Sequence, residues 1–275
     1  MSKPADMEIY FSGRQLYGED LSQSEVDEWL KSEEEGFADL GAKDRQSYSY
    51  GYHAVNIVYG FSHLGTRRFK HVLGFGSAYG HELKPLIRRI EKVSLLDASS
   101  SFVVSDIDGM PVRYIRASPS GDIDLRDSSI DLVTCFGVLH HIPRVTHTLA
   151  EIYRILQSGG LALIREPITS MGDWRAPRPG LTKCERGIPF ELFNDMLGKT
   201  GFIIRRASPC IFPLTDRLGR VLGRSLWNSA PAVRFDALFS RLFAWNLKYH
   251  RKNIFERLAP GHAFWIVEKS GDPNV

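Results

Sequence analysis

The sequence of 275 residues is long enough to bury a full hydrophobic core, and it fits one large α/β domain with additions better than two equal domains. Its hydrophobic content of 43% and charged content of 24% are ordinary for a soluble globular protein. No apolar run approaches the roughly 20 residues of a membrane-spanning helix, no secretory leader opens the chain, and three widely separated cysteines indicate neither a disulfide framework nor a zinc site, so we expect a cytoplasmic protein with reduced thiols.

The net charge of +3 hides an asymmetry between the two ends of the chain. Residues 1–46 hold twelve Asp and Glu against five Lys and Arg, whereas residues 205–257 hold eleven Lys and Arg against three acids. Either these ends attract each other or are simply solvated, or the basic part faces an acidic substrate, an anionic lipid surface or nucleic acid. Of these partners, nucleic acid is the one we do not expect.

Residues 1–66 are expected to form an N-terminal helical segment. The spacing of apolar residues predicts a helix from about Ser22 to Leu40, closed by Gly41. Residues 48–56 follow and are dense in aromatic side chains with polar tips. From their composition alone, these side chains are expected to form an aromatic strip that packs against the sheet.

The stretch His71–Gly80 reads as a buried strand, a tight glycine turn and the start of an amphipathic helix. Glycine allows backbone conformations closed to other residues and a close approach of a ligand, and free N–H groups at a helix start favour an anionic group. A second buried strand, residues 93–97, ends in Asp97, 21 residues after Gly76. A carboxylate at that position can accept both hydroxyls of a ribose, so we expect a nucleoside ligand.

Further strands are predicted at about 111–116, 130–136 and 160–166, alternating with helical segments, as in a parallel sheet covered on both faces. The best-defined helix spans about 146–157, and Gly159-Gly160 is expected to end it. Ligands of such sheets bind beyond the carboxyl ends of the strands. That rule selects the glycine turn, Asp97, the segment 136–141 and the segment 165–167.

At Leu139-His-His-Ile142 and at Glu151-Ile-Tyr-Arg-Ile-Leu-Gln-Ser-Gly-Gly160 the chain resembles the class I S-adenosylmethionine-dependent methyltransferases, in particular the type 11 group. The resemblance covers about residues 70–206. It implies an α/β fold with a doubly wound, mostly parallel seven-stranded sheet of the Rossmann-like methyltransferase kind. The implied domain organisation is an N-terminal lid (1–66), a cofactor-binding core (67–206), a basic helical insertion (207–259), and a last strand with a tail (260–275).

The resemblance implies S-adenosylmethionine as the cofactor, with S-adenosylhomocysteine as the product. The residues that it would place around this cofactor are Gly74, Gly76, Ser77, Ala78, Gly80, Asp97, Ala98, Ala117, Ser118, Phe136 and Tyr50. The resemblance also implies that the N-terminal segment folds over the cofactor as a lid, with Tyr50, Tyr52, His53 and Asn56 as candidates. The chain departs from the family pattern at three places. Gly74 stands where the family usually has an acid, Ala78 replaces a middle glycine, and no acid for the adenine amino group follows Ala117.

The catalytic candidates are His140, His141 and Glu166, which lie at predicted strand ends on the ligand side. A histidine of near-neutral pKa suits removal of a proton from an acceptor hydroxyl, so we assign the base to His140, its orientation to Glu166 and a structural role to His141. No metal is expected, because the sequence shows no further ligands at useful spacing.

Two stretches exceed the minimal fold. Residues 168–189 are rich in Gly, Pro and charge and read as a substrate loop, with Trp174, Arg175, Arg178 and Arg186 as contacts; alternatively they form an ordered surface loop. The insertion 207–259 should contain a helix at about 232–249 with a wide apolar face and several cations. That face either packs on the main domain, forms a homodimer interface or meets a lipid surface.

The resemblance implies a methyltransferase. The loop of residues 168–189 is similar to loops of methyltransferases in polysaccharide pathways, so we expect the protein to act on an oxygen of a polar small molecule or of a glycan or polysaccharide intermediate. One alternative is a non-catalytic S-adenosylmethionine-binding regulatory or scaffold protein, which the altered glycine motif favours. Another is a nicotinamide dehydrogenase on a similar sheet, which the spacing of the glycines disfavours.

Overall fold

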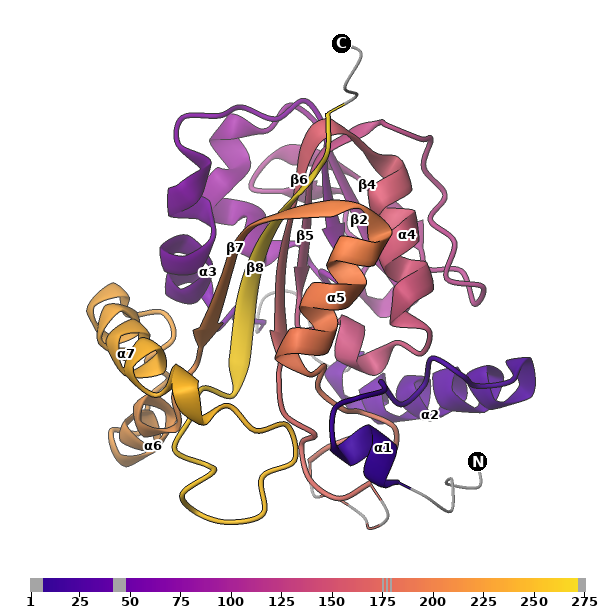
Figure 1. Cartoon of the computed structure of the whole chain (residues 1–275). Coiled ribbons are helices and arrows are strands. Elements are labelled where there is room, and N and C mark those ends of the chain that lie inside the picture. The colour runs from indigo at the N-terminus through magenta and orange to yellow at the C-terminus, as the bar shows by residue number, and fades with distance from the viewer. Residues whose placement is uncertain (1–6, 42–47, 175, 177, 179, 272–275) are drawn as a thin grey trace.

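The computed structural model describes residues 7–41, 48–174, 176, 178 and 180–271, with the backbone alone for residues 35–41. A twisted eight-stranded sheet forms the centre of the molecule (Figure 1), in the order β3-β4-β2-β1-β5-β6-β8-β7. The strands are β1 (Val72–Phe75), β2 (Val93–Asp97), β3 (Asp106–Ile107), β4 (Met110–Arg116), β5 (Ile130–Phe136), β6 (Leu156–Pro167), β7 (Phe202–Cys210) and β8 (His262–Lys269).

The strands β4, β2, β1, β5 and β6 pair in parallel, and β8 lies antiparallel between β6 and β7. The short apolar runs of β1, β2 and β5 are buried along nearly their whole length, as in sheets covered on both faces. The doubly wound, mostly parallel sheet predicted from the sequence is therefore confirmed. The sheet has eight strands instead of seven, because the two-residue β3 pairs with the edge of β4.

Helices cover both faces of this sheet. On one face pack α4 (Val145–Ile155) and α5 (Phe190–Thr200), which contribute Leu149, Ile152 and Phe193 to one core cluster. On the other face lie α3 (His53–Tyr59) and several 3-10 segments, in a second cluster with Val55 and Leu83. Figure 1 shows α3 and α5 on opposite sides of the strands. The 3-10 segments are Phe61–Leu64, His81–Arg89, Ser100–Phe102, Leu139–His141 and Ala244–Asn246.

The segment after the glycine turn is a 3-10 helix, His81–Arg89, where the sequence pattern predicts an amphipathic helix. Pro85 lies inside it. Because proline has no N–H and its ring clashes with the carbonyl four residues earlier, a regular α-helix is disfavoured at this point. The apolar face is nonetheless buried, with Leu83 and Leu86 in the core.

The prediction that Gly159-Gly160 ends the helix is wrong. The helix α4 ends at Ile155, and both glycines lie inside β6, near a shift of register between β5 and β6. Gly159 has a φ of +71°, which favours glycine. At Gly160 a Cβ would lie 2.8 Å from the carbonyl oxygen of Gln157. The two glycines therefore allow the irregular backbone at the start of β6.

The N-terminal segment and the loop of residues 168–189 share a third, smaller core near the carboxyl ends of β5 and β6. The helices are α1 (Glu8–Phe11) and α2 (Gln23–Gly41). Phe11, Tyr17 and Trp29 pack with Trp174 of the loop, and Trp174 has 2% of its surface exposed. The two segments pack against each other in a core of their own, separate from the two core clusters of the sheet.

The insertion between β7 and β8 holds α6 (Pro213–Val221) and α7 (Ala230–Leu242), which contact each other beside β7 (Figure 1). The helix α7 ends seven residues before the predicted end. Asp236 of α7 is buried and accepts the backbone N–H groups of Ile211 and Phe212, which holds the helix to the end of β7. Among the described residues, no helix has the length and apolar character needed to cross a membrane.

Replacement of Trp174 by alanine should lower the free energy of unfolding by about 3–5 kcal/mol, because it empties a buried site at the junction of two segments. The matched control is Trp245→Ala, since Trp245 is 80% exposed and its loss should cost less than about 0.5 kcal/mol. Urea unfolding followed by circular dichroism measures both values. A cost below about 1 kcal/mol for Trp174→Ala would show that the third core adds little to stability.

Candidate active site

The glycine turn that follows β1 takes three left-handed conformations, at Gly76 (φ +63°), Ala78 (φ +46°) and Gly80 (φ +70°). Non-glycine residues adopt this region rarely. Ala78 therefore keeps the backbone shape of the glycine that the family pattern has at its position, with the strain of a Cβ. The turn preserves its geometry although one of its glycines is missing.

The glycines of this turn also have no room for side chains. A Cβ on Gly74 would collide with Ser77, and one on Gly80 would meet Leu95 at 3.0 Å. A Cβ on Gly76 would lie 2.5 Å from the side chain of Val138, which comes from the turn after β5. The glycine loop and the turn after β5 are therefore in direct contact.

Asp97 lies half-buried at the end of β2 and faces the glycine turn. Its carboxylate accepts the N–H of Ala78 at 2.9 Å and the N–H of Ser99 at 3.1 Å. Burial raises the pKa of Asp97, and hydrogen bonds from the backbone of Ser99, Ala78 and Ala98 oppose this. The N–H of Ala117, just past β4, donates to the Asp97 carbonyl oxygen at 2.9 Å. The residues selected from the sequence on three strands thus meet at one edge.

Two other predicted cofactor contacts lie at the same edge. Phe136 is half-buried at the end of β5, and its ring packs against those of Phe61 and Phe264. Ser118 is exposed, and its hydroxyl pairs with that of Ser120 at 2.7 Å.

Glu82 is a buried acid at this site that the sequence analysis missed. It has 4% of its surface exposed, and its Oε1 has no hydrogen-bond partner among the described residues. Burial raises its pKa to about 7, opposed by a hydrogen bond from Ser77, and Asp97 and Arg165 act on it electrostatically. A buried acceptor without a partner is costly unless a ligand supplies a donor. The sequence contained one sign of it, a carboxylate two residues past Gly80.

The segment around Tyr50 is tied to β6 by a chain of hydrogen bonds. Arg165 donates to the side-chain oxygen of Asn56 at 2.8 Å, and Asn56 donates to the Tyr50 hydroxyl at 2.7 Å. The Arg165 guanidinium lies 4.3 Å from the centre of the Tyr52 ring. The lid candidates Tyr50, Tyr52 and Asn56 therefore gather over a buried cation at the ligand side of the sheet.

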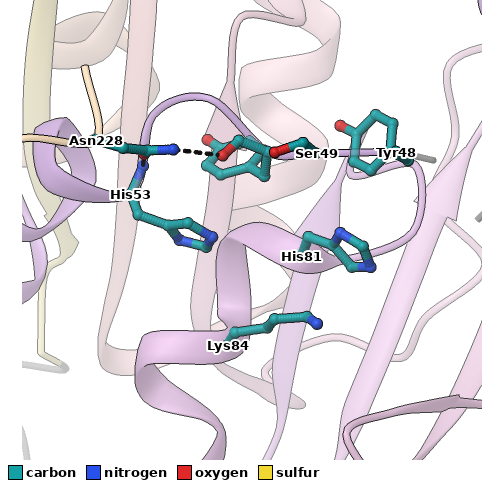
Figure 2. Close-up of a pocket in the computed structure, with 7 residues that line it drawn as sticks. Tyr48, Ser49, His53, His81, Lys84 and Asn228 are labelled. Atoms are coloured by element: carbon teal, nitrogen blue, oxygen red, sulfur yellow. Dashed lines mark hydrogen bonds between the residues drawn. The ribbon is translucent and has the colours of Figure 1, made fainter. Parts of the chain in front are cut away.

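Beside this segment lies an open hollow of about 640 Å³ (Figure 2), lined by Tyr48, Ser49, Tyr50, His53, His81, Lys84 and Asn228. In Figure 2, His53, His81 and Lys84 lie below Tyr48 and Ser49, around the hollow. Asn228, from the loop between α6 and α7, accepts the N–H of His53 at 2.7 Å and donates to the carbonyl of Tyr50 at 2.9 Å. The basic insertion thus borders this hollow, a link that no sequence pattern indicated.

Glu166 is fully buried at the end of β6 and organises the turn after β5. Its carboxylate accepts the N–H groups of Val138 and Leu139, both at 2.9 Å, and binds Nδ1 of His140 at 2.7 Å. The sequence analysis expected Glu166 to orient His140, and the two side chains are in direct contact. The carboxylate also holds the backbone of the turn, which the sequence could not show.

Both ring nitrogens of His140 face carboxylates, because Glu185 Oε1 lies 3.5 Å from Nε2. Burial lowers the pKa of His140, but the hydrogen bonds to Glu166 and Glu185 outweigh it and raise the pKa to about 9. His140 is therefore an imidazolium at neutral pH. A protonated, buried histidine does not fit the general base that the sequence suggested.

His141 pairs with Glu33 of α2, with 3.0 Å between its Nδ1 and a carboxylate oxygen. His140, His141 and Glu185 each place one candidate ligand atom within 4.8 Å of the others. The loop of residues 168–189 brings Glu185 to the two histidines, so a third group joins them that the sequence spacing did not reveal. The acids Glu33, Glu166 and Glu185 pair with the two imidazoles in this arrangement.

The described residues of the loop 168–189 that were predicted to contact a substrate instead make contacts within the protein. Arg186 is fully buried and donates to the carbonyl oxygens of Tyr17, Leu139, His140 and Ile142. Arg178 donates to the carbonyls of Met171, Thr182 and Lys183 within the loop. Trp174 is buried in the third core, and Arg175 lies outside the described residues. These contacts match the alternative reading of this stretch as an ordered loop.

The central part of the chain, residues 73–164, matches the family model of a methyltransferase domain. This segment runs from β1 through the glycine turn and Asp97 to β6. Residues 73–164 therefore form a class I S-adenosylmethionine-dependent methyltransferase domain. The chain is accordingly an S-adenosylmethionine-dependent enzyme. No curated protein matches the chain.

Solved structures with the same fold cover nearly the whole methyltransferase chain. One is the 1,6-didemethyltoxoflavin-N1-methyltransferase of Burkholderia thailandensis with bound 1,6-didemethyltoxoflavin and S-adenosylhomocysteine, at 15% identity, a TM-score of 0.53 and 91% coverage of both chains. Another is the [4+2]-cyclase SpnF, at 14% identity, a TM-score of 0.53 and coverage of 84% of this chain and 85% of that chain. At this identity the likeness shows the fold alone.

The residues present fit S-adenosylmethionine in two respects. Asp97 lies at a strand end beside the left-handed glycine turn, where a carboxylate can accept ribose hydroxyls. The unpartnered Oε1 of Glu82 fits the positive charge of the methionine part of the cofactor. The acid that the family usually has at position 74 is absent here, and Ser77 and Leu95 occupy the space beside Gly74.

Replacement of Glu166 by glutamine should destabilise the methyltransferase by about 3–5 kcal/mol, because the buried imidazolium of His140 loses its charged partner. Glu268→Gln is the matched control, since Glu268 pairs with the exposed Arg205 and such pairs contribute about 0–1 kcal/mol. Chemical unfolding measures both variants. If both replacements lowered the free energy of unfolding by the same small amount, the role given to Glu166 would be contradicted.

Proposed function

We propose that the enzyme transfers the methyl group of S-adenosylmethionine to an oxygen of a polar small molecule or of a glycan intermediate. The observation that carries this proposal is the hollow beside the lid, whose lining consists of hydroxyl, imidazole, ammonium and amide groups. Such a lining suits an acceptor with many hydrogen-bonding groups. Its residues His81 and Lys84 directly follow the glycine turn, which supports a position near the cofactor.

The cofactor supplies an activated methyl group on a sulfonium, and the protein has to align the acceptor and take its proton. Within this proposal Asp97 binds the ribose, and Glu82 binds the α-ammonium group. Arg165 and Asn56 hold Tyr50 over the same edge, which would limit access of water. Tyr48 and Tyr50, which line the hollow, are both electrostatically coupled to Glu82, and this supports a common site.

We assign the base to His53. It lines the hollow, and its Nδ1 has no hydrogen-bond partner among the described residues. Burial and the nearby Lys84 lower the pKa of His53, so its imidazole is neutral at pH 7 and can accept a proton. His140, which the sequence analysis favoured, already carries a proton at that pH, and we assign it to holding the turn after β5.

Glu82 provides a test of the cofactor site that needs no acceptor. Its pKa of about 7 means that the carboxyl is mostly neutral at pH 6 and mostly ionised at pH 7.5. An ammonium group binds the ionised form, so the affinity for S-adenosylhomocysteine should rise by roughly five- to tenfold between these pH values. Calorimetry with wild type and Glu82→Gln measures this. The variant should bind weakly at both pH values; an unchanged pH dependence would remove Glu82 from the site.

The base assignment is tested by methyl transfer to a panel of sugars and hydroxylated small molecules. His53→Ala should lower turnover by roughly 10²–10⁴-fold and leave the affinity for S-adenosylhomocysteine unchanged, because a base acts in the transition state. His147→Ala is the control, since His147 is a partly exposed histidine that pairs with Asp122 away from the hollow. Normal turnover by His53→Ala would contradict the assignment.

Two observations favour a second candidate, a cofactor-binding protein without methyl transfer. The chain lacks the usual acid at Gly74, and Ala78 holds a strained conformation at a glycine position. The cyclase SpnF shares the fold while its name denotes another reaction. Tight binding of S-adenosylhomocysteine, together with no transfer to nitrogen, oxygen or carbon acceptors, would favour this candidate.

A further inference from the structure

The helix α7 is oriented with its apolar side toward solvent. The residues that it buries are Val233, Asp236 and Ser240, of which two are polar. Its large apolar residues Phe235, Leu238 and Leu242 are exposed by 50%, 63% and 61%. A surface helix of a globular protein normally has the opposite arrangement.

The neighbouring helix α6 shows the same reversal. It buries Thr215 and Gly219, whereas its exposed apolar residues recur with helical spacing at Leu214, Leu218, Val221 and, just past its end, Leu222. The exposed apolar surface continues beyond α7 with Trp245, Ile254 and Phe255. Large exposed apolar residues in this number, gathered in one insertion, are typical of an interaction site.

Cations surround these apolar residues. The exposed cations within residues 213–258 are Arg217, Arg220, Arg224, Arg234, Arg241, Lys248, Lys252 and Arg257. The same stretch contains three acids: Asp236 is buried, Asp216 pairs with Arg220, and Glu256 accepts the N–H of Lys252. The exposed cations therefore remain in excess. The insertion therefore presents an apolar and strongly basic surface.

We propose that α6, α7 and the segment 245–258 dock the enzyme on an anionic lipid surface. Apolar residues flanked by Arg and Lys, with an exposed tryptophan, are the composition of segments that lie in the membrane interface. The charge also disfavours a second copy of the chain as the cover, because an isologous dimer would bring two such basic surfaces together. The inference is independent of the acceptor proposed above.

The proposed docking surface is connected to the hollow through the loop between α6 and α7. The loop between α6 and α7 contains Asn228, whose side-chain amide forms hydrogen bonds with the backbone of Tyr50 and His53 beside the hollow (Figure 2). The proposed docking surface and the hollow therefore share the loop that contains Asn228. An amphipathic acceptor could then reach the hollow from the membrane surface.

The test is sedimentation of the full chain with vesicles of phosphatidylcholine alone or mixed with phosphatidylglycerol. We expect binding to the anionic vesicles at low salt and release as salt rises, since charges are screened over about 10 Å at 0.1 M. The variants Leu238→Gln/Leu242→Gln and Arg234→Gln/Arg241→Gln should each lower the partition coefficient about tenfold or more. Matched controls are Val103→Gln/Ile203→Gln, which changes exposed apolar residues elsewhere, and Arg68→Gln/Lys70→Gln.

Trp245 reports whether the apolar residues enter the interface. All five tryptophans are described, and Trp29, Trp174, Trp227 and Trp265 are buried. Vesicle binding should therefore shift the fluorescence of Trp245 to shorter wavelength, and Trp245→Phe should abolish the shift. No binding at low salt, or equal loss in the control variants, would overturn the proposal. So would a dimer in sedimentation velocity that the Leu238→Gln/Leu242→Gln variant dissociates.

Discussion

Glu166 is a fully buried carboxylate at the end of β6, and the turn after β5 is built around it. It accepts two backbone N–H groups of that turn and the imidazolium of His140. From the other side, the buried guanidinium of Arg186 takes the carbonyl oxygens of Leu139, His140 and Ile142. One buried anion and one buried cation thus satisfy most of the backbone polar groups of this turn, which fixes its shape.

Segments from elsewhere in the chain pack against the turn after β5. Arg186 belongs to the loop of residues 168–189, so its hydrogen bonds to the turn hold this loop against the sheet, and it also donates to the carbonyl of Tyr17. Separately, Trp29 of α2 donates its indole N–H to the carbonyl of His141. The N-terminal acids enter the same network, since Glu33 pairs with His141. The acidic N-terminal segment therefore contributes to the methyltransferase fold, while the basic insertion keeps its cations at the surface.

The sequence predicted the sheet well, because short apolar runs separated by glycine turns have few other ways to be buried. Asp97 and the glycine turn followed from the same pattern. Glu82 and Glu185 could not be found this way, since their roles depend on burial and on a loop that returns to the sheet from elsewhere in the sequence. The reversed orientation of α6 and α7 was equally hidden, because periodicity defines an apolar face but not the direction in which it points.

The protonation state of His140 tests the account most directly, because it separates a histidine that holds the turn from one that acts as the base. Nuclear magnetic resonance of protein with 15N-labelled histidine reports the state of each ring nitrogen, and His140→Gln assigns the signal. The structure predicts that both nitrogens carry protons at pH 7.5 and that the ring titrates near pH 9. A neutral ring at pH 7.5 that titrates at or below the ordinary histidine value of about 6.5 would contradict it.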